Sequence, residues 1–426
     1  MSAAAAVPGR VRVPGVVLLL AAVTFCLGTS EFMIAGLLEQ IADDLDVSIP
    51  QAGLLITAFA GGMVVGAPAM AVLTLRLPTR STLVLMTVVF AGAHVLGALA
   101  PGYGALLASR VVAAVACGGY WAVAAVHAHR ASPPEAVGRS LASLVGGLTI
   151  ANLVGVPGGA WLGEQYGWRA AFWVIAVVTA LAAVLVAVTV RDRRPAEGVA
   201  EPTAPTRTRD LLARELGVFR TGRIWLALAT TALFQASVFA AFSYFSPLLT
   251  KVAGLDPDAV PLALVGFGVG AFVGVTAGGR IADRNLFGNL LGSLVATAGS
   301  LLLLAAVASV PWAAIGAVLL VGMSAFSIAG ALNARVFQIA ADAPTLAASM
   351  NTAAFNIGNA AGPALGGAVI ALGLGYRAPL LVGVVLAVGA LATTLVVIRR
   401  EGIRVRRAAP SVASVVQVPA EACCAD

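Results

Sequence analysis

Long apolar runs separated by short polar connectors make up most of the chain. A transmembrane helix needs about 20 mostly apolar residues, and twelve runs come close to or exceed that length. They cover residues 14–38, 50–75, 81–100, 104–128, 139–162, 170–190, 224–249, 261–280, 287–309, 311–333, 345–372 and 378–397. The pattern therefore predicts an all-α polytopic protein that crosses a membrane twelve times.

The composition excludes most soluble classes. Hydrophobic residues make up 60% of the 426 residues and charged residues 11%, whereas a soluble domain carries about 25% charged residues. Such a chain could not cover a water-facing surface, which excludes a cytosolic enzyme and a disordered protein. The net charge of +7 does not indicate a nucleic-acid binder, because the basic residues lie in the short connectors. We expect the lipid bilayer as a partner and no nucleic acid.

The basic residues predict the orientation. If the N-terminus is cytoplasmic, 22 of the 26 basic residues lie on the cytoplasmic side, and three lie outside: Arg169, Lys251 and Arg377. Lys and Arg concentrate in cytoplasmic loops, so we expect a cell (cytoplasmic) membrane protein with both termini in the cytoplasm. The predicted parts are a cytoplasmic N-terminus (1–13), a six-helix bundle (14–190), a cytoplasmic linker (191–223), a second six-helix bundle (224–397) and a cytoplasmic tail (398–426).

The two predicted bundles resemble each other. Phe59-Ala-Gly-Gly-Met-Val-Val-Gly66 matches Phe267-Gly-Val-Gly-Ala-Phe-Val-Gly274, and Asn152-Leu-Val-Gly155 matches Asn359-Ala-Ala-Gly362. Two parallel repeats of this kind are typical of one class of secondary transporter, whose substrate site lies between the halves near the membrane midplane. Glycines at every fourth position favour close helix packing rather than a nucleotide loop: Gly266, Gly270, Gly274 and Gly278.

Few ionisable side chains fall deep inside a predicted span. Glu31 lies about 17 residues into the first run, and a charge at such a depth costs about 2.5–3.5 kcal/mol on insertion scales. We expect Glu31 to face a cavity and to carry a proton; the alternative is a structural acid paired within the bundle. Arg110 cannot lose its proton, so we expect it to organise a polar network or to tune the pKa of a carboxyl group rather than to carry a proton. The alternative is a purely structural arginine. His94 fits a core histidine with satisfied hydrogen bonds better than a proton relay.

Uncharged amides and aromatic side chains supply candidate substrate contacts. This combination suits an amphipathic organic molecule, although the asparagines could instead make interhelical hydrogen bonds. The candidates are Trp121 in the fourth run, Gln235, Phe239, Phe242 and Tyr244 in the seventh, and Asn351, Phe355 and Asn359 in the eleventh. No HExxH, GxSxG or Walker motif occurs, and the four cysteines show no metal spacing. We therefore expect no enzyme activity, metal or cofactor, and a proton gradient as energy source.

Three motifs carry a family resemblance. They are Gly28-Thr-Ser-Glu-Phe-Met-Ile-Ala-Gly-Leu-Leu38, Leu106-Leu-Ala-Ser-Arg110 and Gly167-Trp-Arg-Ala-Ala-Phe-Trp173. Through these motifs, the region from about residue 14 to about residue 397 resembles the major facilitator superfamily, and within it the twelve-span drug:proton antiporters. The likeness is to the subgroup of chloramphenicol-resistance exporters and sugar- or arabinose-efflux permeases. It implies the major facilitator fold and proton coupling through Glu31 and Arg110.

Two motifs depart from the family pattern. The loop Gly66-Ala-Pro…Arg76-Leu-Pro-Thr-Arg80 lacks the acid that the family places there, whereas its repeat copy Gly279-Arg-Ile-Ala-Asp-Arg284 keeps one. The resemblance therefore implies a gate formed by Arg76, Arg80, Asp283 and Arg284. The fifth-span sequence Gly155-Val-Pro-Gly-Gly159 is a variant of the antiporter motif.

Proton-coupled efflux of a small organic compound is the predicted function. The first candidate is chloramphenicol or a similar drug, so that the protein would confer resistance, and we expect it to function as a monomer. The alternatives are efflux of sugars or other metabolites, uptake by proton symport, and a non-transporting membrane sensor or a membrane enzyme.

Overall fold

The computed structural model describes residues 13–73, 77–133, 136–190, 221–340 and 344–402, and within these ranges it contains helices and no strands. The first half of the chain forms α1 (Gly15–Asp44), α2 (Ile49–Leu73), α3 (Thr79–Ala98), α4 (Tyr103–Ala131), α5 (Val137–Ile150), the π-helical turn η3 (Ala151–Gly155), α6 (Val156–Tyr166) and α7 (Trp168–Thr189). The second half forms α9 (Gly222–Phe242), α10 (Phe245–Lys251), the 3₁₀ turn η5 (Pro257–Ala259), α11 (Val260–Arg284), α12 (Leu286–Val307), α13 (Pro311–Ser327), α14 (Ala329–Ile339), α15 (Pro344–Ala371) and α16 (Ala378–Glu401).

Helices occupy all twelve predicted spans. Within the described ranges, eleven helical stretches are long and apolar enough to cross a membrane. The remaining predicted span coincides with α15, a helix of 28 residues whose hydropathy is lowered by three amides: Asn351, Asn356 and Asn359. The prediction of an all-α membrane protein is confirmed, and α15 carries candidate site residues.

Prolines interrupt two of the spans. A proline lacks the N–H that would bond to the carbonyl four residues earlier, and its ring clashes with that carbonyl. Pro247 stands in the first turn of α10, and the chain turns at Ser243 and Tyr244 between α9 and α10. Pro157 stands at the start of α6, directly after the π-helical turn η3. Such π-helical turns often occur at functional sites.

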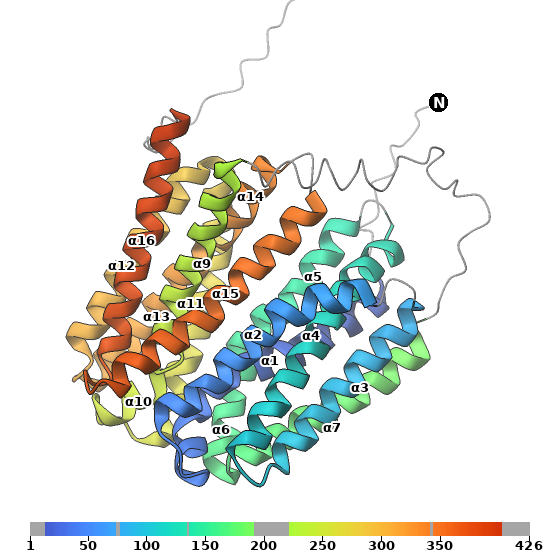
Figure 1. Ribbon diagram of the computed structural model, residues 1–426, viewed down its shortest axis with the longest axis horizontal. Helices are drawn as coiled ribbons and strands as arrows, with labels where there is room; N and C mark the ends of the chain where they lie inside the picture. The colour runs from blue at the N-terminus through green and yellow to red at the C-terminus, as the bar shows by residue number, and fades with distance from the viewer. Residues whose placement is uncertain (1–12, 74–76, 134–135, 191–220, 341–343, 403–426) are drawn as a thin grey trace, which may run out of the picture.

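The same packing pairs recur in both halves, as the internal repeat predicts. In the first half α2 packs on α4, and α3 packs on α7; in the second half the corresponding pairs are α11 with α13 and α12 with α16. The first span packs on the fifth as the seventh packs on the eleventh (α1 with α5, α9 with α15). Figure 1 shows the two six-helix halves lying side by side.

Glycines let α11 approach α13 closely. A Cβ added at Gly270, Gly274 or Gly278 would collide with backbone atoms of α13, and the neighbour of Gly278 is the carbonyl of Ser327. Gly266 differs, because a Cβ there would lie 3.8 Å from Leu319, an ordinary contact. The predicted glycine stripe is therefore a helix-packing surface over three of its four positions.

The two ends of the bundle differ. Figure 1 shows that α1 begins and α16 ends at the end where α7 stops and α9 starts; we call this the linker end, and the opposite end the far end. The halves meet through α2 with α15, through α11 with η3 and α6, and through α1 with α10. The last pair places one contact between α1 and the second half at the far end, beyond Glu31.

Candidate functional site between the two halves

Glu31 lies where the two halves meet. It is the seventeenth residue of the 30-residue helix α1 and is half-buried. Its carboxylate Oε1 accepts a hydrogen bond of 3.2 Å from Nδ2 of Asn359, on α15 of the other half. A carboxyl group in mid-span thus bonds across the interface rather than within its own half.

The bond to Glu31 is one link in a chain of amides. Because an ionised carboxylate can only accept, Asn359 must present its NH₂ group to Glu31 and its oxygen to the opposite side. That oxygen accepts a bond of 2.8 Å from Nε2 of Gln235 on α9. The structure therefore brings together three predicted site residues, Glu31, Gln235 and Asn359, in one directed hydrogen-bond chain.

Aromatic rings from both halves pack beside this chain. Phe32, next to Glu31 on α1, lies 5.5 Å from Phe239 and 6.4 Å from Phe242, measured between ring centroids. Phe242 also stacks at 4.8 Å on Phe267 of α11. The predicted residues Phe239 and Phe242 are both buried, so they form an apolar wall between the halves next to the amides.

Arg110 is bound to the residue before Glu31. Its Nη1 donates to the Ser30 hydroxyl at 2.9 Å, and its Nη2 donates to the Ser30 carbonyl at 3.0 Å. Its guanidinium carbon lies 4.4 Å from the centre of the Phe59 ring, a cation–π contact. Within the described part of the chain Arg110 makes no direct ion pair with Glu31, although the two charges interact electrostatically. Arg110 is therefore linked to the residue before Glu31 by hydrogen bonds, and its role in proton coupling stays a prediction.

Further contacts join the halves toward the far end. Both carboxylate oxygens of Glu39 accept from the Thr250 hydroxyl, at 2.8 and 2.9 Å, and Lys251 lies 3.7 Å away. Gln165 donates to Asp258 at 3.3 Å. Closer to Glu31, the Thr57 hydroxyl donates to the carbonyl of Ala360 at 3.1 Å. These bonds hold the halves together from the midpoint to the far end.

Tyr244 belongs to this closed region. Its hydroxyl donates to the carbonyl of Pro363 at 2.7 Å, and its ring is buried. Gly53 of the other half abuts the same hydroxyl so closely that a Cβ would collide with it. The structure thus places Tyr244 at a contact between the halves, one or more turns beyond the amide chain.

No described hydrogen bond or ring contact joins the other predicted substrate contacts to Glu31. Asn351 is bonded within its own half, accepting from Thr231 at 3.2 Å and donating to Asn333 at 2.8 Å. Phe355 is half-buried against the apolar core, as is Trp121. Trp121 stands 11 residues from Arg110 on α4, about 16 Å along the helix. The amide of Asn351 therefore makes the interhelical bonds that were the alternative interpretation of the asparagines.

The predicted gate residues are at the linker end or outside the described structure. Arg76 lies outside the described residues. Arg80 is exposed near the start of α3, and Asp283 and Arg284 are exposed in the last turn of α11. The gate formed by these residues stays a prediction.

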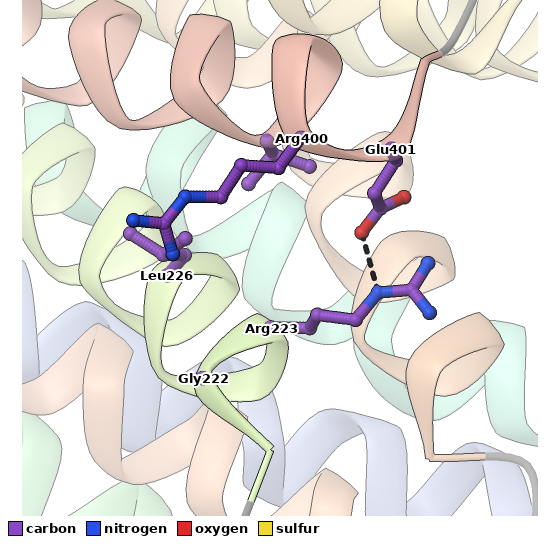
Figure 2. Close-up of a pocket in the computed structure, with 6 residues that line it drawn as sticks. Gly222, Arg223, Leu226, Arg400 and Glu401 are labelled. Carbon is purple, nitrogen blue, oxygen red and sulfur yellow. Dashed lines mark hydrogen bonds and ion pairs between the residues drawn. The ribbon is translucent and has the colours of Figure 1, made fainter.

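A cavity of about 460 Å³ opens at the linker end of α9 and α16. Figure 2 shows Arg223 and Glu401 paired there, with Nε of Arg223 2.7 Å from Oε1 of Glu401 and Arg400 turned toward Leu226. Arg335 of α14 pairs with the same carboxylate. This ion-pair group ties three helices of one half together, and it contains none of the predicted site residues.

Sequence reasoning did not single out several residues of the interface. Ser30 and Phe32 flank Glu31 within the motif already noted, and Glu39 lies two turns further along α1. Ser30 carries no charge, so only the partner Arg110 reveals its role. The position of Glu39 near the end of the first predicted span was a usable signal, since it too is an acid on the helix that carries Glu31.

Comparison with known proteins identifies the family. The sequence matches the Major Facilitator Superfamily over residues 20–352. The chain belongs to this superfamily. It is a multi-pass membrane transporter with a small-molecule substrate, and it is not an enzyme.

Relatives from several bacteria cover most of the chain. A chloramphenicol resistance protein of Streptomyces lividans is 42% identical over 85% of this chain and 91% of its own length. The inner membrane transport protein YdhP of Escherichia coli K12 is 36% identical over 87% of this chain and 92% of its own. A probable sugar efflux transporter of Helicobacter pylori is 27% identical over 83% of this chain and 88% of its own. The predicted exporter subgroup is confirmed at this level.

A solved structure shares the fold. The crystal structure of a bacterial homolog to the human lysosomal transporter Spinster, inward-facing and unoccupied, superposes with a TM-score of 0.76 at 18% identity. The match covers 93% of this chain and 98% of that one. At this identity the likeness shows the fold alone.

Proposed function

We propose that the protein is a proton-coupled antiporter that exports a small neutral organic compound across the cell membrane, with chloramphenicol or a similar drug as first candidate. The observation that carries the proposal is the chain of Gln235, Asn359 and Glu31 between the halves. The 42% identity to a chloramphenicol resistance protein supports the choice of drug.

The chain of amides offers a way to link proton and substrate. When Glu31 is ionised, it holds the NH₂ group of Asn359; a proton on Glu31 removes the charge and weakens that bond, since hydrogen bonds to charged groups are stronger than neutral ones. A substrate that bonds to Asn359 or Gln235 competes for the same amides. Proton and substrate therefore bind at linked sites, which antiport requires.

The surroundings of the amides suit an uncharged aromatic compound. The amides can both donate and accept hydrogen bonds, and Phe32, Phe239 and Phe242 supply ring surfaces. Chloramphenicol combines an aromatic ring with hydroxyl and amide groups, so it matches both features. A sugar would use the amides, but it would leave more of the ring surface uncovered.

Alternating access accounts for the uneven contacts between the halves. Transporters of this fold rock one half against the other around a central site. The bonds of Glu39 to Thr250 and of Thr57 to Ala360 close the far end. We assign the linker end to the cytoplasm on the charge asymmetry, and we assign Arg76, Arg80, Asp283 and Arg284 to the contacts that close this end in the opposite state.

Transport into proteoliposomes tests the direction of coupling. An antiporter accumulates substrate in vesicles with an acid lumen, because protons leave as substrate enters; a symporter accumulates it in vesicles with an alkaline lumen. We expect accumulation of chloramphenicol with an acid lumen and its loss on adding a protonophore. Accumulation only with an alkaline lumen would contradict antiport, and accumulation of arabinose but not chloramphenicol would select the sugar alternative.

Cysteine labelling tests the orientation. Asp43 is exposed at the far end, whereas the neighbouring Asp44 is bonded to Arg169 and Trp168, so Asp43 is the better label position. Pro202 lies in the 191–223 linker, outside the described residues. A membrane-impermeant maleimide added to intact cells should modify a cysteine at 43 and not one at 202; the reverse pattern would overturn the assignment.

A further inference from the structure

A histidine lies behind Arg110, and the transport mechanism proposed above does not use it. His94 of α3 is 1% exposed. Its ring lies between two phenylalanines, with centroid distances of 4.4 Å to Phe90 and 5.6 Å to Phe172. Both ring nitrogens are nevertheless within hydrogen-bond distance of a partner. Nδ1 is 2.8 Å from the carbonyl of Phe90, and Nε2 is 2.6 Å from the Ser30 hydroxyl.

The hydrogen bonds assign the proton on the ring. A backbone carbonyl can only accept, so Nδ1 must carry a hydrogen. In the neutral ring Nε2 is then an acceptor, and it accepts from the Ser30 hydroxyl. The Ser30 oxygen in turn accepts from Nη1 of Arg110. The bonds therefore run in one direction, from Arg110 through Ser30 to His94, and the Ser30 hydroxyl both donates and accepts.

A charged ring would break this order. Its Nε2 would carry a hydrogen aimed at the Ser30 oxygen, which already accepts from Arg110, and the serine hydrogen would lose its acceptor. A second buried cation would also lie behind Arg110. The charged group that acts on the ring is Arg110 from α4, while α7 contributes the uncharged ring of Phe172.

We propose that His94, held as the neutral Nδ1–H tautomer, is a positioning residue that fixes Arg110 beside Glu31 through the Ser30 hydroxyl. With both terminal nitrogens on Ser30 and its face on Phe59, Arg110 is kept from closing directly onto the Glu31 carboxylate. Glu31 is thereby left to bond with Asn359 of the other half. The functional part of this inference rests on the proposed proton coupling.

Nitrogen NMR tests the tautomer without any transport assay. The chain contains three histidines, His94, His127 and His129, so protein labelled with ¹⁵N-histidine and embedded in bilayers gives a small set of imidazole signals. The His94→Gln variant assigns the signal of residue 94. We expect that signal to show protonated Nδ1 and unprotonated Nε2 from pH 5 to pH 8. A doubly protonated ring within this range, or an Nε2–H tautomer, would overturn the proposal and leave the proton-coupling proposal standing.

Two replacements separate positioning from packing. His94→Gln keeps an acceptor that faces Ser30 but loses the ring, and His94→Phe keeps a ring between Phe90 and Phe172 but loses the acceptor. If His94 positions Arg110, the Gln variant should transport about tenfold faster than the Phe variant under a proton gradient, a difference of about 1.4 kcal/mol. Ser30→Ala should then transport as slowly as the Phe variant. If His94 only fills space, the Phe variant should transport as well as or better than the Gln variant.

Folding is controlled within the same comparison. Each variant is purified, its thermal unfolding is measured, and transport is expressed per folded protein. If the variants at position 94 do not fold, the signal of residue 94 is assigned by replacing His127 and His129 instead, and the ¹⁵N spectrum then decides the tautomer.

Discussion

Replacing Asn359 by alanine tests the link between the halves. Asn359 is 6% exposed and makes two side-chain bonds, one to Glu31 of the first half and one to Gln235 of its own. A hydrogen bond to a charged group contributes about 1.5–3 kcal/mol. Because the Glu31 bond exists only while the halves meet here, its loss should lower the population of this state, relative to the opposite one, by about tenfold to a hundredfold.

Asn351 provides a matched control on the same helix. It is 3% exposed and also makes two side-chain bonds, to Thr231 and Asn333. Both partners belong to its own half, so Asn351→Ala should lower the stability of that half by a similar amount without changing how the halves meet. Each variant thus removes two side-chain hydrogen bonds. Of these four bonds, only the one from Asn359 to Glu31 crosses the interface between the halves.

Spin-label distances measure the outcome. Labels at Asp43 and Leu374, both exposed at the far end, report the separation of the halves. The native Cys26 and Cys117 are buried, and Cys423 and Cys424 are replaced by serine. Asn359→Ala should shift the distribution toward longer distances, and Asn351→Ala should not. An unchanged distribution in Asn359→Ala, or an equal shift in both variants, would refute the reasoning.

Two further predictions concern stability, and thermal unfolding in detergent checks both. Gly278→Ala should lower the free energy of unfolding by about 1–3 kcal/mol, because its Cβ would collide with the Ser327 carbonyl. Its control, Gly279→Ala, meets nothing within 4 Å and should cause no measurable change. Equal effects of the two variants would contradict the role of Gly278 in helix packing. Glu401→Gln should cost about 1–3 kcal/mol, because it leaves the buried Arg335 without its carboxylate. Arg223→Gln removes only the exposed partner of Glu401 and should lower the free energy of unfolding by at most about 1 kcal/mol. A larger loss for Arg223→Gln than for Glu401→Gln would show that Arg335 does not depend on Glu401.

The membrane makes the architecture of this protein predictable from sequence. Because every backbone polar group must be satisfied within lipid, each long apolar run has to become a helix, and all twelve did. The hydropathy pattern does not report where such a helix breaks. The chain therefore appeared as single spans where the structure has a turn at Ser243 and a π-helical turn at Ala151–Gly155.

The site was predictable in its residue types and only partly in its contacts. Glu31 stood out because an acid in mid-span is costly, and Asn359 because it recurs in the repeat at Asn152. Their contact joins positions 328 residues apart, and no local pattern reports such a distance. Asn351 has the same side chain and the same helical face as Asn359, yet it bonds within its own half, since each amide takes the partner nearest to it.

The most direct test of proton coupling is uphill transport by Glu31→Gln, which mimics the protonated carboxyl. Proteoliposomes with a lumen two pH units more acid than the bath supply about 2.7 kcal/mol per proton. The unmodified protein should concentrate chloramphenicol under this gradient. Asp43→Asn, which neutralises an exposed acid at the far end of α1, should still concentrate it, and Glu31→Gln should only equilibrate it. If Glu31→Gln also accumulates chloramphenicol above the bath concentration, Glu31 does not carry the coupled proton and the proposed mechanism is wrong.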